Sequence, residues 1–287
     1  MRWKREQAGY PPGHFYSPVP DVQDLEARAD SIWGATDLQT PGIDFNDASH
    51  EAILTRDFPR FMPEYTYPDD GVPDDRLEGF YSRNSEFGWL DSRALFVLLR
   101  TWRPARIIEV GSGYSSLLMA DVNTRFLAGA ADITCIEPYP RPFLLKTMPG
   151  ITRLMHARVQ EVPLSTFDAL QAGDVLFIDS SHVSKTGSDV NMLLLTVLPR
   201  LRPGVRVHVH DIFLPQDYPR DWVLKLQYHW NEQYLLQALL ARNSSVFRVL
   251  FGSHYAHLRF PRLVGAALGL PSGPGYGGGS FWFEVVS

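Results

Sequence analysis

The chain has 287 residues, of which 45% are apolar and 21% are charged, as in an ordinary globular protein and unlike a disordered one. Its formal net charge of -5 provides no overall positive field for phosphate groups, so we expect no nucleic acid as a partner. Cys135 is the only cysteine, which excludes an internal disulfide and a zinc site built from several cysteines.

The beginning of the chain and its apolar runs argue against secretion and against a membrane partner. Residues 1–6 are followed by a polar Pro/Gly stretch at residues 10–13 instead of the apolar core of a signal peptide. The longest apolar runs, such as residues 193–195, end well before the roughly 20 residues that cross a bilayer. Together with the single cysteine, which suits a reducing compartment, these features predict a cytoplasmic protein.

Residues 1–90 are expected to form an irregular N-terminal extension or lid. Up to about residue 78 this part is rich in Pro, Gly, Asp and aromatic residues, and it shows no strong strand pattern. One short segment, residues 21–32, has apolar residues at helical spacing. Further on, residues 84–89 lie where such a lid could fold over a ligand.

From residue 91 onward, helical and extended patterns alternate, which is the sign of βαβ units and of a parallel sheet covered on both faces. The predicted strands are short and apolar, at residues 106–110, 132–136, 152–156, 175–178, 205–210, 247–251 and 280–286. The predicted helices are residues 92–101, 115–126, 162–170, 186–199 and 221–241. Residues 91–287 should therefore form one α/β domain.

Two segments after the fifth predicted strand have alternative interpretations. In the helical pattern at residues 221–241, the apolar stripe that includes Trp222 and Trp230 most simply packs against the core. The aromatic and polar residues there could instead form a pocket for a sugar or a polyketide; they are Tyr218, Trp222, His229, Trp230, Glu232 and Tyr234. We favour packing for Trp222 and Trp230. The glycine-rich residues 275–279 predict a flexible loop.

The first predicted strand ends in a glycine-rich turn. Gly111-Ser112-Gly113 carries the chain into a helix that begins near Ser115. Glycines permit positive φ and a close approach of a ligand to the backbone, while the free N–H groups of the helix point into the same crevice. Ser116 occupies the place of the third glycine of a dinucleotide fingerprint, so a pyrophosphate ligand is disfavoured.

Two glutamates at strand ends suggest what this turn binds. Glu109, just before the glycines, suits a ligand with a cationic centre. Glu137 closes the next strand, where a carboxylate can accept hydrogen bonds from ribose hydroxyls. A charged amino acid joined to adenosine satisfies both.

The fourth and fifth predicted strands end in carboxylate and imidazole side chains, which can act as bases or bind a metal. Asp179 and His182 follow the fourth strand, and His210 and Asp211 end the fifth, so all four should meet at one edge of the sheet. If a group is transferred to a hydroxyl oxygen, a base must remove the proton of that hydroxyl. The candidate bases are His182 and, if it is desolvated, Lys185.

A divalent metal is a second means of activating a hydroxyl. Asp179 and Asp211 could hold Mg²⁺, whereas His210 would make the site suitable for Mn, Fe, Co or Zn. His208 lies on the same face of the fifth strand but deeper, and we interpret it as a structural histidine.

The combination of Glu109-x-Gly111-x-Gly113, Glu137 and Asp179 resembles the class I S-adenosylmethionine-dependent methyltransferases over roughly residues 90–286. The resemblance implies a Rossmann-like, doubly wound, mostly parallel seven-stranded sheet with an antiparallel last strand. It also implies that the turn contacts the methionine part of the cofactor, that Glu137 holds the ribose and that a residue after the third strand flanks the adenine. The implied cofactor-binding residues are Glu109, Gly111, Ser112, Gly113, Ser115, Ser116, Glu137, Val159, Gln160 and Asp179.

Within this class the second set of residues is similar to the metal-dependent O-methyltransferases of the macrocin and catechol types. In those enzymes an acid after the fourth strand and a pair after the fifth bind the metal, which corresponds to Asp179, His210 and Asp211. His182 falls where the macrocin type places its general base. The departure is His210, where those enzymes have a carboxylate.

These features favour S-adenosylmethionine-dependent methyl transfer to a hydroxyl of a small-molecule acceptor, a sugar or another natural product, with His182 as base and with Mg²⁺, Mn²⁺ or another divalent metal as a candidate cofactor. One alternative is a non-catalytic cofactor-binding scaffold or partner subunit, which would keep the turn and Glu137 but lack a working base. Another is a dehydrogenase, which the missing third glycine disfavours. A homo-oligomer is compatible with the sequence.

Overall fold

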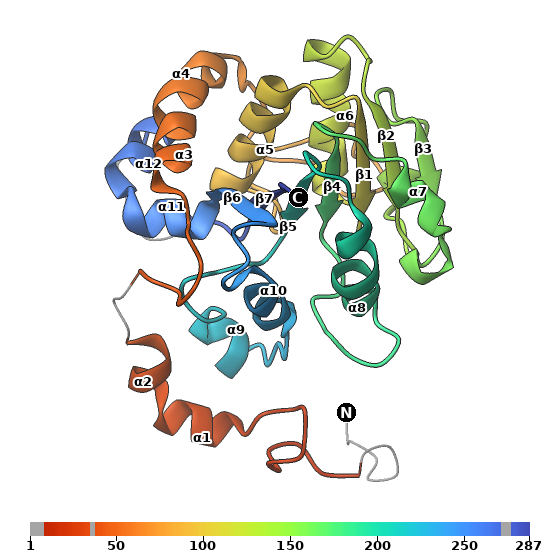
Figure 1. The fold of residues 1–287 in the computed structure, drawn as a ribbon. Helices are drawn as coiled ribbons and strands as arrows, with labels where there is room; N and C mark the ends of the chain where they lie inside the picture. Colours follow the sequence, from red (N-terminus) through yellow and green to blue (C-terminus); the bar gives the residue numbers. More distant parts are fainter. Residues whose placement is uncertain (1–8, 35–37, 271–276) are drawn as a thin grey trace.

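The computed structural model describes residues 9–34, 38–270 and 277–287 and contains one seven-stranded sheet (Figure 1). Its strands stand in the order β3-β2-β1-β4-β5-β7-β6. They are β1 Arg106–Val110, β2 Asp132–Ile136, β3 Arg153–Met155, β4 Val175–Ile178, β5 Arg206–Val209, β6 Phe247–Gly252 and β7 Phe281–Val285. The pairs among β1 to β5 are parallel and both pairs of β7 are antiparallel, which confirms the predicted fold class.

The order of the strands fixes where a ligand can enter. The chain moves outward from β1 through β2 to β3 and then returns to the other side of β1 with β4. In open α/β sheets such a reversal opens a crevice at the carboxyl ends of the two central strands. The turn after β1 and Asp179 after β4 both lie at this crevice.

The helices of the sheet domain lie on both faces of the sheet (Figure 1). Alternate strand residues build two cores: Ile107, Ile133 and Val175 belong to one, and their neighbours Ile108 and Leu176 belong to the other. The first core contains the long helices α5 and α6, and the second contains α8 and α10. The helices from α5 onward are α5 Trp89–Trp102, α6 Tyr114–Phe126, α7 Leu164–Asp168, α8 Asp189–Met192, α9 Arg220–Leu224, α10 Glu232–Leu240, α11 Ser253–Arg259 and α12 Pro261–Leu268.

Helix α8 continues through the π-helical turn η6 (Leu193–Val197) and the 3-10 turn η7 (Leu198–Arg200), in agreement with the predicted helix at residues 186–199. The two helices α11 and α12 were not predicted, because their short apolar patterns follow a strand without a clear break. No helix among the described residues is long and apolar enough to cross a membrane.

The first 90 residues contain more regular structure than the sequence predicted. The expected helix at residues 21–32 is present as α1 (Val22–Ala27) and α2 (Ala29–Trp33). A second helical run was missed; it comprises α3 (Asp47–Ala52), the π-helical turn η2 (Ile53–Asp57) and α4 (Phe58–Phe61). Its buried side chains, among them Phe58, join the core that contains α5. The boundary near residue 90 stays a prediction.

The predicted helix at residues 221–241 is wrong as one continuous element. The chain leaves the helix after α9 and re-enters it at α10, and Gln227 between them has a φ of 56°. Two N–H groups at the start of α10, those of Asn231 and Glu232, donate to the backbone carbonyl of His182 at 3.0 and 3.2 Å. Helical spacing predicts a continuous helix here, but this contact with a distant loop overrides it.

A buried carboxylate organises the turn between β1 and α6. Glu109 is fully buried and accepts hydrogen bonds from the hydroxyls of Ser115, at 2.6 Å, and Ser116. The thiol of Cys135 on β2 contacts the same carboxylate at 3.3 Å. Burial raises the pKa of Glu109 to about 7, although the hydroxyl donors oppose the shift. The side chain therefore joins the strand to the first turn of the helix.

The raised pKa of Glu109 predicts a pH-dependent stability. The folded state favours the protonated acid, so this contribution to the free energy of unfolding is present below the ordinary pKa of 4.5 and is lost as the pH rises through about 7. The shift corresponds to roughly 3 kcal/mol. Glu109→Gln cannot ionise, so urea unfolding at pH 5 and pH 8 should show the variant gaining stability relative to wild type at the higher pH.

A matched control for this measurement is Glu51→Gln, which removes an exposed carboxylate on helix α3. It should show no comparable change between the two pH values. An equal difference between wild type and Glu109→Gln at pH 5 and pH 8 would contradict the role of Glu109.

Candidate active site

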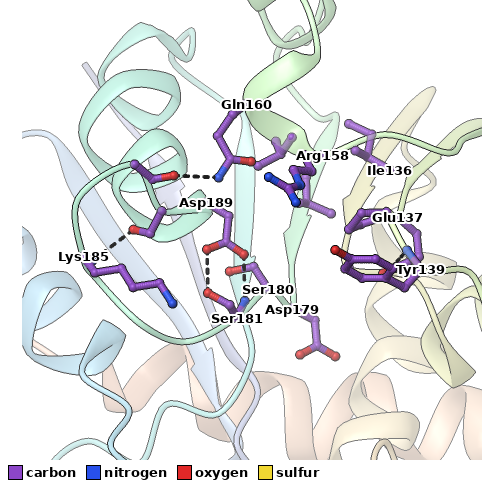
Figure 2. A pocket seen from close by; sticks show the side chains of 16 residues that line it. Ile136, Glu137, Tyr139, Arg158, Gln160, Asp179, Ser180, Ser181, Lys185 and Asp189 are labelled. Atoms are coloured by element: carbon purple, nitrogen blue, oxygen red, sulfur yellow. Dashed lines mark hydrogen bonds between the residues drawn. The ribbon is translucent and has the colours of Figure 1, made fainter. Parts of the chain in front are cut away.

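A cavity of about 480 Å³ opens at the carboxyl ends of β1, β2 and β4 (Figure 2). Its walls come from the glycine turn, from the ends of β2 and β4, from the 3-10 turn η5 (Val159–Glu161) and from the start of α8. The residues that line it are Val110, Gly111, Ile136, Glu137, Pro138, Tyr139, Arg158, Val159, Gln160, Asp179, Ser180, Ser181, Lys185, Gly187, Ser188 and Asp189.

Five of the predicted cofactor-binding residues line this cavity: Gly111, Glu137, Val159, Gln160 and Asp179. The carboxylate of Glu137 accepts N–H groups from Ser112 at 3.0 Å and from Tyr139 at 2.7 Å. Each carboxylate oxygen has a second lone pair, so Glu137 can still accept a hydrogen bond from a ligand hydroxyl. Gln160 lies at the opposite wall (Figure 2), where its amide donates to the carbonyl of Gly187 at 2.9 Å.

Gly111 makes the closest backbone contact of the site. Its φ is +83°, and a Cβ added there would lie 1.6 Å from the carbonyl oxygen of Asp179. A side chain at this position is excluded by both the conformation and the neighbouring strand.

The other five predicted cofactor-binding residues stand behind the cavity and do not line it; they are Glu109, Ser112, Gly113, Ser115 and Ser116. The carboxylate of Glu109 is fully buried and bonded to the helix start, so it does not present a charge to the cavity as the sequence suggested. The N–H of Gly113 donates to the hydroxyl of Ser116 at 3.0 Å. These five residues hold the glycine turn in place through hydrogen bonds within the protein.

Lys185 lies away from the other candidate base. It is exposed and lines the first cavity, whereas His182 is buried and lines a different one. The desolvation that a basic lysine requires is therefore absent.

A second cavity of about 680 Å³ adjoins the first, and the two share Asp179, Ser180 and Ser181. Trp222, Tyr228 and Trp230 contribute aromatic surface to it. The remaining lining residues are Asn84, Ser85, Glu86, Gly88, Trp89, Asp91, His182, His210, Asp211, Phe213 and Gly277 to Gly279. Trp222 and Trp230 thus line a cavity, and the expectation that they only pack the core is wrong.

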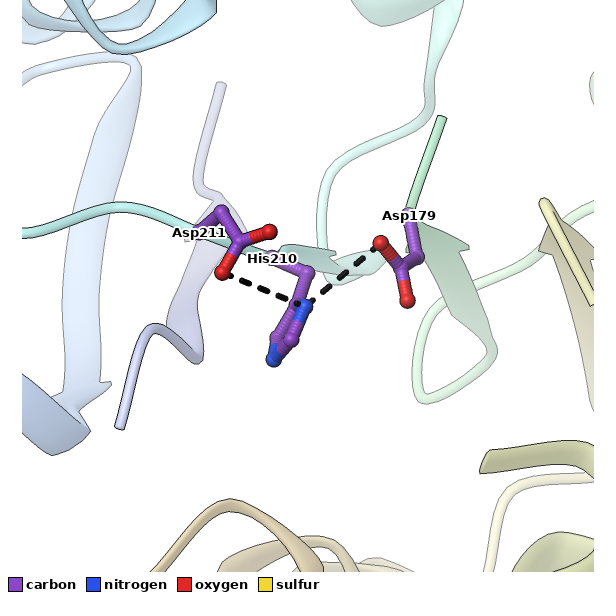
Figure 3. A group of neighbouring side chains, drawn as sticks. All are labelled: Asp179, His210 and Asp211. Carbon is purple, nitrogen blue, oxygen red and sulfur yellow. Dashed lines mark ion pairs between the residues drawn. The ribbon is translucent and has the colours of Figure 1, made fainter. Parts of the chain in front are cut away.

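Asp179, His210 and Asp211 meet at the boundary of the two cavities (Figure 3). One potential ligand atom from each lies within 4.8 Å of the others. The Nδ1 atom of His210 is 3.5 Å from Oδ1 of Asp179 and 3.7 Å from Oδ1 of Asp211. The sequence placed these three residues together correctly.

His182 approaches the same carboxylates from the other side. Its Nε2 is 3.4 Å from Oδ1 of Asp179 and 3.4 Å from Oδ2 of Asp211, while its Nδ1 is 3.0 Å from the fully buried Glu232. Both His182 and Asp211 have positive φ, 59° and 57°, which is uncommon for these residue types and concentrates at functional sites. Backbone and side chain of His182 are thus both fixed by the start of α10.

His210 has a buried partner as well. Its Nε2 is 3.3 Å from Oδ2 of Asp91, on the first turn of α5. The carboxylate of Asp91 also accepts the N–H groups of Gly279 and Ser280, each at 2.9 Å. Residues 277–279 of the predicted flexible loop are therefore bound to the site, whereas residues 275 and 276 lie outside the described residues.

Burial and charge shift the pKa values of these groups in opposite directions. Burial disfavours the imidazolium of His182, but hydrogen bonds to Asp179 and Glu232 and the charge of Asp211 raise its pKa to about 10. Burial raises the pKa of Asp211 and of Glu232. The pKa of Asp179 is lowered, because the charges and hydrogen bonds of the two histidines outweigh its burial.

Two supporting residues escaped the sequence reasoning. Asp91 lies in a strongly apolar helix, and Glu232 was considered only as part of an aromatic-polar pocket. The available signal was chemical: a carboxylate in an otherwise apolar, buried segment requires a partner. His208, in contrast, is buried against Phe177 with its Nε2 3.0 Å from the hydroxyl of Ser280, as a structural histidine should be.

Comparisons with known proteins find one family match and one relative. Residues 108–212 match the family described as methyltransferase domain. An uncharacterized protein from Archaeoglobus fulgidus is 36% identical over 190 residues, which cover 62% of this chain and 82% of the relative.

Two solved structures give the extent of structural likeness. The O-methyltransferase TomG from Streptomyces achromogenes is 16% identical with a TM-score of 0.40 and covers 92% of this chain and 96% of its own. An O-methyltransferase from Bacillus cereus is 14% identical with a TM-score of 0.38 and covers 93% and 100%. The domain match thus identifies residues 108–212 as part of a methyltransferase domain, within the seven-stranded Rossmann-like sheet expected of the class I S-adenosylmethionine-dependent enzymes.

Proposed function

We propose that this methyltransferase transfers the methyl group of S-adenosylmethionine to a hydroxyl of a small molecule bound in the second cavity. The observation that carries the proposal is that the two cavities meet at residues 179–181, with His182 facing the second one. A cofactor in the first cavity would present its methyl group at this boundary. Nucleic acid and membranes have no part in the proposal.

The cofactor would occupy the first cavity in an extended form. Glu137 would accept the ribose hydroxyls, and Val159 and Gln160 would flank the adenine at the far wall. The methionine part would then lie along Gly111, whose missing side chain lets the ligand reach the backbone. Glu109 acts through the turn and does not contact the ligand.

The acceptor would bind in the second cavity. Trp222, Tyr228 and Trp230 offer flat apolar surfaces, with the rings of Tyr228 and Trp230 stacked at 4.7 Å between centroids. No lysine or arginine is found among the described residues that line this cavity, which disfavours a phosphorylated or carboxylated acceptor. A neutral molecule with hydroxyls and a flat or ring-shaped apolar part, such as a sugar or an aromatic natural product, suits these walls.

His182 in its neutral form would remove the proton from the acceptor hydroxyl. The charges of the neighbouring carboxylates, which raise its pKa to about 10, must be offset for that form to be populated near pH 7. The methyl carbon–sulfur bond breaks as the carbon–oxygen bond forms, and the proton passes to Nε2 of His182, giving the methyl ether and S-adenosylhomocysteine. Glu232, bonded to Nδ1, keeps the ring oriented and stabilises its positive charge.

The donor set of Asp179, His210 and Asp211 fits a divalent cation, since three potential ligand atoms converge within 4.8 Å. Such a cation would oppose the charge of the two carboxylates and thereby lower the pKa values of His182 and of the acceptor hydroxyl. This chain's own residues would still orient the acceptor and take up its proton.

Gly111→Ala should abolish cofactor binding. The added Cβ would overlap the carbonyl oxygen of Asp179, so the turn and the end of β4 must separate. Isothermal titration calorimetry with S-adenosylhomocysteine measures the loss. Gly173→Ala is the matched control, because Gly173 also has a positive φ, +91°, but has open space for a Cβ.

Each variant should lose about 1–2 kcal/mol of folding stability from the positive φ. Gly111→Ala should lose more because of the overlap with Asp179, and only this variant should lose the ligand; thermal unfolding shows whether it is still folded. Wild-type affinity in Gly111→Ala would contradict the placement of the cofactor.

His182→Ala should lower turnover about 10²- to 10⁴-fold, because a general base contributes a factor of this size. Release of S-adenosylhomocysteine is measured with a panel of catechols, flavonoids and glycosides as acceptors. Affinity for S-adenosylmethionine should remain near wild type, since His182 lines only the second cavity.

His14→Ala, which removes a histidine that lines neither cavity, serves as the control. Unchanged turnover in His182→Ala would remove His182 as the base. A wild-type protein that binds the cofactor and methylates none of these acceptors would favour the non-catalytic scaffold.

A further inference from the structure

We propose that the cluster at the boundary of the two cavities is built for a transition metal such as Mn²⁺, Fe²⁺, Co²⁺ or Zn²⁺ rather than for Mg²⁺, with Nδ1 of His210 as a ligand and Asp91 as the residue that positions it. This inference rests on the proposed function, because it assigns the metal of the same site.

The orientation of His210 makes Nδ1 the ligand atom. Its Nε2 points toward the carboxylate of Asp91, at 3.3 Å. A carboxylate only accepts hydrogen bonds when ionised, so Nε2 keeps a hydrogen, and Nδ1 is the nitrogen that can offer a lone pair once a cation displaces its proton. Figure 3 shows Nδ1 directed between Asp179 and Asp211.

The separations of the three donor atoms fit one cation. Nδ1 of His210 is 3.5 and 3.7 Å from the nearest oxygens of Asp179 and Asp211, longer than a normal hydrogen bond. Donor atoms that each lie about 2.1 Å from a common cation are themselves roughly 3 to 3.5 Å apart. Small side-chain movements would therefore complete the coordination.

The carboxylate of Asp91 is fixed in place, so it can pair with the imidazole of His210 in one orientation only. Its carboxylate is almost completely buried and accepts the N–H groups of Gly279 and Ser280. The backbone passes so close that a Cβ on Gly278 would lie 2.2 Å from either carboxylate oxygen. A carboxylate that binds the far nitrogen of a metal-binding histidine fixes the ring and makes it a better ligand, and its loss typically lowers metal affinity 10- to 100-fold.

An imidazole ligand changes which metal the site prefers. Mg²⁺ is bound by oxygen ligands and keeps several waters, whereas imidazole favours first-row transition metals. Where a carboxylate ligand would bring a negative charge, His210 brings a neutral donor, and this weakens the attraction of the site for a hard cation. Asp179 and Asp211 alone resemble a magnesium site, but the third ligand does not fit one.

The test is metal binding to the protein with S-adenosylhomocysteine bound, after removal of metals by a chelator. Calorimetric titration with MnCl₂, CoCl₂ and MgCl₂ should give saturable binding of Co²⁺ and Mn²⁺, at least tenfold tighter than that of Mg²⁺. The visible absorption of bound Co²⁺ reports a nitrogen ligand independently of activity. His210→Asp should lower the ratio of Co²⁺ to Mg²⁺ affinity at least tenfold and remove this spectroscopic contribution.

Asp91→Asn should weaken Co²⁺ binding about 10- to 100-fold while S-adenosylhomocysteine still binds. Asp174→Asn is the matched control: Asp174 is equally buried and also accepts two backbone N–H groups, those of Arg106 and Gln171, but lies at the other end of β4. It should leave Co²⁺ affinity unchanged, and thermal unfolding of both variants separates lost metal binding from lost folding.

Three outcomes would overturn the inference. The first is that no metal binds saturably, which would leave only an internal ion-pair network. The second is equal affinity for Mg²⁺ and Co²⁺. The third is that Asp91→Asn and Asp174→Asn weaken Co²⁺ binding equally. None of these outcomes concerns the binding of the cofactor. Failure of the wild-type protein to bind S-adenosylhomocysteine would instead contradict the proposed function, and the metal titration without cofactor would still decide the inference.

Discussion

The site depends on the contact between Gly111 and the carbonyl oxygen of Asp179. That oxygen occupies the space that a side chain on Gly111 would fill, and the N–H of Asp179 donates to Val110 at 2.8 Å. The ends of β1 and β4 are therefore joined by backbone at the point where the strand order reverses. As a result, the side chain of Asp179 lies at the boundary of both cavities, between the wall for a cofactor and the wall for an acceptor.

Near this contact the protein buries two histidines, and each of them lies between carboxylates on two sides. Each of the two imidazoles, His182 and His210, directs one nitrogen toward the carboxylates at the strand ends and the other toward a buried acid on a helix. Burying such charges is costly unless every one has a partner, so the acids on α5 and α10 are as necessary as the carboxylates at the strand ends. Helices α5 and α10 thereby fix the orientation of the two rings.

The sequence predicted the strand ends well, because parallel strands bring their carboxyl ends to one edge of the sheet. Asp179 and Asp211 could be placed together for this reason. Asp91 could not, since its pairing depends on how α5 crosses the sheet. The burial of Glu109 was within reach: strand alternation puts it on the face of Ile107, which α6 covers, and a charge there must be satisfied internally.

The interruption of the predicted helix at residues 221–241 shows how the site overrides local pattern. In a continuous helix the N–H groups of Asn231 and Glu232 would bond to carbonyls four residues earlier. Because α10 begins anew at Glu232, these are free N–H groups of a helix start, and both donate to the carbonyl of His182. The same interruption leaves Trp230 tilted against the ring of His182, with centroids 4.4 Å apart. The break in the helix thus creates both the support of the imidazole and an aromatic wall beside it.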